Sequence, residues 1–425
     1  MQLSEEIIAE RKGTTIQKIV KTVAFFAYIY SVTIVGLLSG EVLAILIGFV
    51  FVAVSKRGIR IYSSNEGTKA AKKLFGFLIF AFLYSLFALY ISNSMNSFDI
   101  SLPRILIFLF LYGGIAYIVF TNWVYSVEEL FSILFLVSII QAIIIFATIL
   151  SPSIAEIVDN LPINSSQYFT YSTMRKMGYQ SGIACITSTG SLQLSMGLIA
   201  CVYFILNRSK NGAYIFAFFF LSVIMTTVSR TGLLLAIAAL IIIMFSKRSS
   251  KKYRVIGVLL LVFFVALIII PLTNLGGSLS VIFSRLIKTK EIGLYNSFFD
   301  GYFQTGSFIT ERGIPPITWK TILGVGITSG TSGNGVYINA DGGFFRLYAA
   351  LGLPTAIITI CYLFFGAIKN TRSIKENSLR IVAIVFVTFL IIGEFKEPFV
   401  LSTRYMLIMF LVYLTLLHRE QTRYI

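Results

Sequence analysis

The chain has 425 residues, of which 57% are hydrophobic and only 12% are charged, and its mean hydropathy is +0.86. Soluble proteins carry about 25% charged residues, so this composition excludes a soluble globular domain and indicates a polytopic membrane protein. The net charge of +17 would point to nucleic acid on a soluble domain, but here the position of the bases relative to the bilayer decides its meaning.

The apolar segments predict an all-α membrane protein that forms one integral membrane domain over residues 1–425. A helix needs roughly 20 residues to cross about 30 Å of hydrocarbon, and about twelve segments meet that requirement. In chain order they lie near 19–39, 41–55, 74–92, 104–121, 130–150, 183–206, 213–229, 230–246, 255–271, 342–368, 379–395 and 399–417.

The basic residues predict the orientation of these spans. When both termini are placed on one side, most of the bases fall into the short loops of that side, and by the positive-inside rule that side is cytoplasmic. The excess charge then reports orientation and contact with anionic lipid, so no nucleic-acid partner is expected. The loop 121–129 is an exception, because it carries Glu128 and Glu129 and no base.

Two loops on the outer side are longer than a turn requires, the shorter at 151–182 and the longer at 272–341. Recognition is therefore expected on the outside. No glycine-rich phosphate loop follows a strand, which argues against a cytoplasmic nucleotide-driven motor. The three cysteines form no CxxC pair, and His418 is the only histidine, so neither a disulfide framework nor a zinc site is expected.

The segment 212–247 is apolar except at its centre, which reads Ser229-Arg230-Thr231-Gly232. Basic loops on both sides predict a hairpin with Arg230 at its outer tip. Each arm of about 16 residues spans about 24 Å, so the tip should lie below the outer surface. An arginine at that depth costs roughly 2.5–3.5 kcal/mol. It is either a snorkelling or paired arginine, or a clamp for an anion.

A second polar cluster flanks the last two predicted spans. It contains Glu394, Lys396, Glu397 and Arg404, which sit near the outer interface. A closed ion-pair network that locks two helices and a functional site are equally compatible with this pattern.

The long outer loop ends in Gly324-Val325-Gly326 and then in a stretch that contains Asp341 and Arg346. Glycines permit sharp turns and close approach to a ligand. Asp341 is expected in the first turn of the next helix, where the ordinary role of an aspartate is N-capping. Arg346 lies inside the apolar run and needs an anionic partner.

The outer face is rich in arginine, which grips phosphate oxygens bidentately and stays charged. No carboxylate pair is spaced for a divalent ion, so phosphate is expected to be neutralised without a metal or another cofactor. The arginines concerned are Arg175, Arg230, Arg312, Arg346 and Arg404.

Four motifs together resemble the O-antigen polymerase and O-antigen ligase superfamily. They are the hairpin tip Ser229-Arg230-Thr231-Gly232, the RxxG at Arg175 to Gly178, the GxG at Gly324 to Gly326 with Asp341-Gly342, and Gly352-Leu353-Pro354.

The resemblance implies a GT-C-like glycosyltransferase of the bacterial inner membrane, with both termini cytoplasmic. It would act at the periplasmic face on undecaprenyl-diphosphate-linked oligosaccharide, without metal or cofactor, with a chain-length regulator protein as a further candidate partner. Ligases of this superfamily carry a functional histidine shortly after the GxG, where this chain has Asn339 to Asp341. That difference favours polymerase over ligase and places Asp341 where the histidine would act.

The sequence hypothesis is therefore a polysaccharide polymerase with Arg230 and Asp341 as catalytic residues. The alternatives are a flippase or transporter of lipid-linked oligosaccharide, a ligase, and a non-catalytic scaffold. The expected substrate-binding residues are Arg175, Arg312, Arg346, Arg404, Lys396, Glu394 and Glu397.

Overall fold

The computed structural model describes most of the helical part of the chain. The ninth predicted span, 255–271, lies outside the described residues, as do most of the two long outer loops. The described residues are 15–34, 38–54, 66–92, 101–161, 182–185, 187–208, 211–245, 317–327, 330–331, 337–338, 343–396 and 404–423.

The first predicted span, 19–39, is shorter than expected. Its helix ends at Ile29, Ser31 takes a positive φ of 48°, and a two-residue antiparallel strand pair follows. The β-branched run Val32-Thr33-Ile34 explains this, because such side chains prefer extended backbone to helix. The elements of this part are α2 (Thr15–Ile29), β1 (Thr33–Ile34), β2 (Leu38–Ser39), α3 (Gly40–Val54) and α4 (Glu66–Ile91).

The middle of the chain contains the longest apolar helices. α7 begins after Ser126, whose hydroxyl accepts a hydrogen bond from the Glu129 amide and caps the helix. The short α8 has Ser151 as its N-cap and a proline in its first turn, the preferred position for proline in a helix. The elements are α5 (Ser101–Phe108), the π-helical turn η2 (Leu109–Gly113), α6 (Gly114–Trp123), α7 (Val127–Leu150), α8 (Pro152–Asn160), α10 (Thr187–Asn207), α11 (Gly212–Val228) and α12 (Arg230–Phe245).

In the C-terminal part, the tenth predicted span, 342–368, is split into two helices at Gly352, which has a positive φ of 76°. A short helix and a second strand pair precede it. The elements are α16 (Trp319–Leu323), β3 (Gly330–Thr331), β4 (Tyr337–Ile338), α17 (Gly343–Leu351), α18 (Leu353–Arg372), α19 (Asn377–Lys396) and α20 (Arg404–Arg423).

The described helices make this an all-α protein suited to a membrane, as the composition predicts. In the described part of the chain, five segments are long and apolar enough to cross a bilayer, and three shorter helices are also apolar. The five are Gly67–Ile91, Leu102–Trp123, Val127–Leu150, Thr189–Asn207 and Asn377–Glu394.

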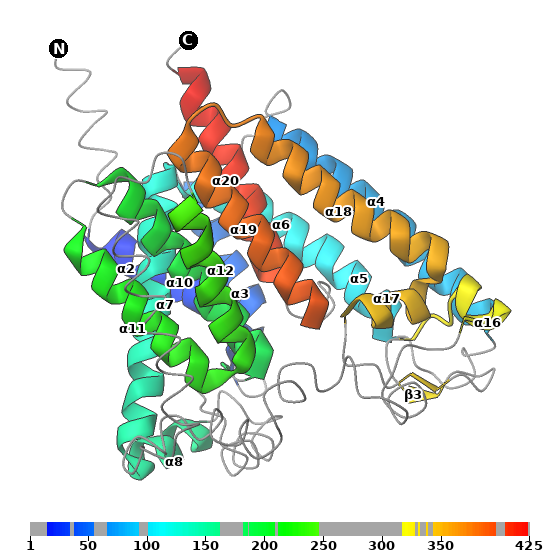
Figure 1. The fold of residues 1–425 in the computed structure, drawn as a ribbon, viewed down its shortest axis with the longest axis horizontal. Helices are drawn as coiled ribbons and strands as arrows, with labels where there is room; N and C mark the ends of the chain where they lie inside the picture. The colour runs from blue at the N-terminus through cyan, green and yellow to red at the C-terminus, as the bar shows by residue number, and fades with distance from the viewer. Residues whose placement is uncertain are drawn as a thin grey trace.

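α10 forms the centre of the bundle. Most of its apolar window is buried, 83% against 33% for α4, and it packs against α7, α11, α12 and α19. Figure 1 shows these helices grouped together, with α4 and α18 side by side at the edge of the molecule. α10 is therefore the element against which the surrounding helices are positioned.

The helices alternate in direction, so the bundle has two distinct ends. One end holds the C-terminal part of α20 and the turn between α18 and α19; α8 and α16 lie at the opposite end (Figure 1). We call the first the basic end, because Arg372 and Arg380 flank the turn between α18 and α19 and Arg419 lies near the end of α20. Lys21 and Arg208 join them there, because they and Arg419 contact the segment 121–129. The other is called the far end.

Three glycines at the far end have left-handed backbone conformations that disfavour other residues. Gly324, Gly326 and Gly352 have φ angles of 85°, 74° and 76°. A Cβ atom on Gly352 would lie 2.3 Å from the carbonyl oxygen of Ile322. The GxG segment and the break between α17 and α18 are thus fitted backbone against backbone.

Hydrogen bonds fix the same junction. The amides of Val325 and Gly326 donate to the carbonyl oxygens of Ala349 and Ala350, both at 2.9 Å. The Ser92 hydroxyl at the end of α4 donates to the Val325 carbonyl at 3.0 Å. These glycines therefore allow close approach to α17, α18 and α4. The sequence had instead indicated close approach to a ligand.

The junction gives a first test. Gly352→Ala should lower the free energy of unfolding by at least about 1–2 kcal/mol, because alanine disfavours the left-handed conformation and its methyl group would overlap the Ile322 carbonyl. The measurement is thermal unfolding of the detergent-solubilised protein. The matched control is Gly366→Ala on α18, where an added Cβ meets nothing within 4 Å; equal stability of the two variants would contradict this packing.

Candidate functional site

The predicted helical hairpin is present, with a single residue between its arms. Ser229 is extended, with φ −160° and ψ 160°, and its amide donates to the Met225 carbonyl at 3.0 Å. The Ser191 hydroxyl from α10 lies 2.8 Å from the Ser229 hydroxyl and 3.2 Å from the Met225 carbonyl. The hairpin tip is therefore tied to the central helix of the bundle.

This geometry places Arg230 at the first position of α12. The first turn of a helix presents free amide groups and the positive end of the helix dipole, which favour an anion. A guanidinium at the same position adds a full positive charge. The Arg230 side chain lies outside the described residues, so the electrostatic character of the tip follows from the backbone position of Arg230.

Gly232 lets the two arms of the hairpin approach each other. A Cβ atom at this position would lie 2.3 Å from the Met225 carbonyl oxygen, a separation that real Cβ atoms do not show. The glycine of the Ser-Arg-Thr-Gly motif is thus required by the packing of α12 on α11.

The second predicted cluster lies at the same end of the molecule. Glu394, near the end of α19, is only 1% exposed, and α19 packs against α12, which begins at Arg230. Burial of a carboxylate is tolerated only with compensating charge or hydrogen bonds. Lys396 ends α19 and Arg404 begins α20, so cations from three helices share this end, although the side chains of all three lie outside the described residues.

A carboxylate that the sequence reasoning missed also lies at the far end. Glu41, in the first turn of α3, accepts hydrogen bonds from the Ser31 hydroxyl at 3.1 Å and from the Tyr405 hydroxyl. Tyr405 follows Arg404, and its ring packs edge-on against Tyr28 at 5.3 Å. Its signal in the sequence was a lone acid at the first position of the predicted span 41–55.

The remaining predicted site residues are only partly placed. Arg346 is half-buried on α17, which packs against α4, α16, α18 and α19. α17 begins at Gly343, two residues after Asp341. Asp341, Arg175, Arg312 and the Glu397 of the second cluster lie outside the described residues, so their roles stay predictions.

No group of three or more metal-ligating side chains is present in the described part of the chain. The described carboxylates at the far end are Glu41 of α3, Glu394 of α19, and Glu156 and Asp159 of α8.

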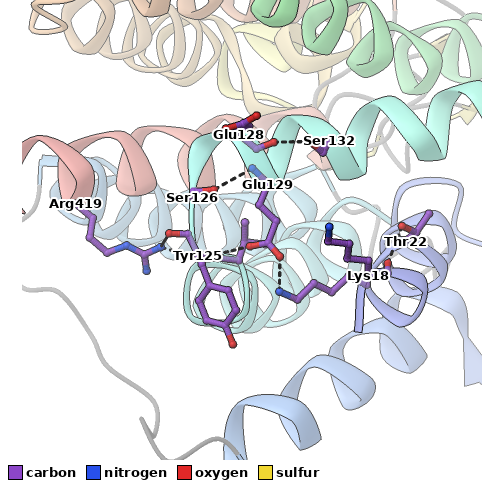
Figure 2. Close-up of polar contacts among 10 residues, drawn as sticks. Lys18, Thr22, Tyr125, Ser126, Glu128, Glu129, Ser132 and Arg419 are labelled. Atoms are coloured by element: carbon purple, nitrogen blue, oxygen red, sulfur yellow. Dashed lines mark hydrogen bonds and ion pairs between the residues drawn. The ribbon is translucent and has the colours of Figure 1, made fainter. Parts of the chain in front are cut away.

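The basic end shows how the bundle compensates a deeply placed charge. Lys21 Nζ lies 2.6 Å from Glu129 Oε1, and the lysine side chain is only 3% exposed. The other carboxylate oxygen of Glu129 accepts the Tyr125 amide at 2.7 Å, and the Tyr125 ring lies 4.3 Å from Lys21 Nζ. Figure 2 shows the carboxylate of Glu129 turned toward these partners at the start of α7.

Arg419 of α20 closes the same loop from the opposite side. Its guanidinium donates to the carbonyl oxygens of Thr121, Val124 and Tyr125, at 3.0, 2.9 and 2.7 Å. These carbonyls belong to the end of α6 and to the loop that follows, where helical partners run out. The arginine thus caps a helix C-terminus, where the helix dipole favours a cation.

These contacts account for the exception in the charge pattern. The loop 121–129 has no base of its own, but Lys21 and Arg419 bind it, and Arg208 forms an ion pair with Glu128. The loop therefore lies at the basic end with the neighbours that the topology predicted, and its acids are neutralised by other segments.

Comparisons with known proteins do not place the chain in a family: no protein-family model matches it, and no curated protein matches it significantly.

The ion pair of Lys21 with Glu129 gives a second test. Removing one partner of a buried pair typically costs about 3–5 kcal/mol; because Glu129 keeps 22% exposure, we expect Lys21→Met to lose about 2–3 kcal/mol. Thermal unfolding of the detergent-solubilised protein measures this loss of stability.

The matched control is Glu128→Gln, which breaks the exposed pair with Arg208, whose side chains are 42% and 58% exposed. It should cost less than about 1 kcal/mol. If both variants lose the same amount, the Lys21 pair has no special role in holding the loop.

Proposed function

We propose that this protein is a polysaccharide polymerase of the bacterial inner membrane. It transfers a growing glycan from undecaprenyl diphosphate to a sugar hydroxyl of the next lipid-linked repeat unit, at the periplasmic face. The observation that carries the proposal is the hairpin tip, which puts Arg230 at the start of α12, at the end of the bundle opposite the basic end.

The chemistry of glycan transfer explains why an arginine suits this position. The bond from the anomeric carbon to the diphosphate oxygen breaks, so negative charge grows on the diphosphate while the sugar becomes oxocarbenium-like. A guanidinium binds two phosphate oxygens at once and cannot lose its proton. In this proposal Arg230 and Arg175 hold the diphosphate, and no metal is needed.

The acceptor needs a group that orients its hydroxyl and removes its proton as the new bond forms. Asp341, just before α17, is the proposed residue, because it lies where ligases of the resembling superfamily carry their functional histidine. Arg312, Arg346 and Arg404 are proposed contacts to phosphate or sugar.

Glu394, Lys396 and Glu397 complete the proposed substrate-binding set. The nearly complete burial of Glu394 equally supports a structural network that holds the ends of α12, α19 and α20. In either role this network positions Arg230, because α12 and α19 pack together.

A flippase or transporter of the same lipid-linked units is the main alternative. Transporters bind their substrate near the bilayer midplane, between related halves of the fold. In the five described segments long enough to cross a bilayer, the charged residues lie near the ends of the segments. This arrangement favours chemistry at a membrane face over binding at the midplane.

Arg230→Ala tests the proposal in cells. Loss of one well-placed charged hydrogen bond in the transition state lowers rate by about 10²–10³, so the surface glycan should shrink to a single repeat unit. The measurement is electrophoresis of extracted surface glycan from a strain that carries only the variant at native level.

The matched control is Arg208→Ala at the basic end, which should leave chain length unchanged. Normal chain length with Arg230→Ala would refute the assignment. Absence of single units from the surface of a deletion strain would favour the flippase, and accumulation of polymer that stays on its lipid carrier would favour the ligase.

A further inference from the structure

A groove separates α18 from α19 and is not used by the proposed reaction. Its volume is about 570 Å³, within the range of roughly 300–1,000 Å³ typical of small-molecule sites. It is lined by Ile368, Thr371, Arg372, Asn377, Arg380, Ile381, Ile384, Val387, Thr388 and Ile391.

The lining is polar at one end and mostly apolar along the rest. Arg372 in the last turn of α18 and Arg380 near the start of α19 stand at the basic end, beside Asn377. From Arg380 to Ile391 the helix rises about 16 Å at 1.5 Å per residue, about half of the 30 Å hydrocarbon core. The groove therefore has the length of one leaflet.

The basic charge at the polar end exceeds the acidic charge beside it. Arg380 donates to the Asn377 side-chain oxygen, and in the described part of the chain neither arginine forms an ion pair with a carboxylate. The nearby Glu376 accepts a hydrogen bond from Ser378 at 2.6 Å. Two guanidinium groups thus stand at the mouth of an apolar groove, where the C-terminus of α18 and the N-terminus of α19 meet.

We propose that this groove binds an anionic phospholipid from the leaflet at the basic end. One acyl chain lies along Ile384, Val387 and Ile391, and the phosphate is held between Arg372 and Arg380. The length and apolar lining of the groove fit one acyl chain, and the two arginines favour a headgroup of net negative charge. Anionic phospholipids of the cytoplasmic leaflet have both features.

The bound lipid would connect two parts of the bundle. α18 packs against α4 and α17, α19 packs against α10, α12 and α17, and α18 and α19 also contact each other along the groove. α18 and α4 lie to one side of α19 in Figure 1. The lipid fills the groove between these groups, so its binding stabilises the folded protein by mass action.

Native mass spectrometry of the detergent-solubilised full chain tests this inference. The probes are dioleoyl phosphatidylglycerol, dioleoyl phosphatidylcholine with identical chains, and inorganic phosphate. Wild-type protein should bind phosphatidylglycerol at least about tenfold more tightly than phosphatidylcholine, and only phosphatidylglycerol should raise the thermal unfolding midpoint.

The double variant Arg372→Gln/Arg380→Gln should lose that preference. Its control, Lys369→Gln/Lys375→Gln, removes the same charge from residues beside the groove that do not line it, and should keep the preference. Unfolding midpoints without lipid establish that both variants are folded.

Equal binding of the two lipids by wild-type protein would overturn the proposal, as would equal loss in both double variants. Stabilisation by inorganic phosphate alone would show an anion site without a lipid. Ile384→Trp, which fills the groove, should also abolish tight phosphatidylglycerol binding, and its failure to do so would show that the acyl chain lies elsewhere.

Discussion

A charge placed among apolar helices must be compensated, and this constraint organises the whole bundle. Around the loop 121–129 at the basic end the buried charges have partners: Lys21 pairs with Glu129, and Arg419 donates to three backbone carbonyl oxygens at the end of α6 and in the loop that follows. Such contacts hold α2, α7 and α20 at one level, because moving any of them would strand a buried charge. The basic end is therefore the fixed part of the structure.

At the far end, polar groups are also held by hydrogen bonds, but Arg230 is proposed to have a substrate as its partner. Ser191 and Ser229 hold the hairpin tip, and Glu41 is held by Ser31 and Tyr405. Arg230 stands at the first position of α12, where the helix dipole favours an anion. In the proposed function the partner of Arg230 is a substrate phosphate. The cost of removing the arginine from water is then offset only when substrate is bound.

The sequence predicted the features that depend on hydropathy and charge. The helical class and the hairpin with its break beside Arg230 followed from apolar length and from one polar interruption. The short strand pair at 33–39 was missed because an apolar β-branched run matches a helical span as well as a strand. The break at Gly352 was missed because the apolar pattern continues through it, and only the backbone conformation of Gly352 reveals it.

The site was harder to predict because it depends on contacts between distant segments. Glu41 and Tyr405 are 364 residues apart, and no local pattern joins them. The GxG glycines resembled a ligand-binding turn, yet Gly324 fits against the backbone of residues 350–352 and Gly326 fits against Leu89 of α4. A tight turn needs glycine for either purpose. The acidic loop 121–129 seemed to oppose the predicted orientation of the spans, because it has no base of its own. The bases that neutralise it come from distant segments, at α2, the end of α10 and α20.

The most direct test of the central claim uses purified protein and lipid-linked repeat units isolated from cells that lack it, with EDTA present. The wild-type protein should join the units into long chains on undecaprenyl diphosphate, and Arg230→Ala should leave them as single units. Polymer formed equally well by Arg230→Ala, or no elongation by the folded wild-type protein until a divalent metal is supplied, would contradict an arginine-based, metal-free transfer.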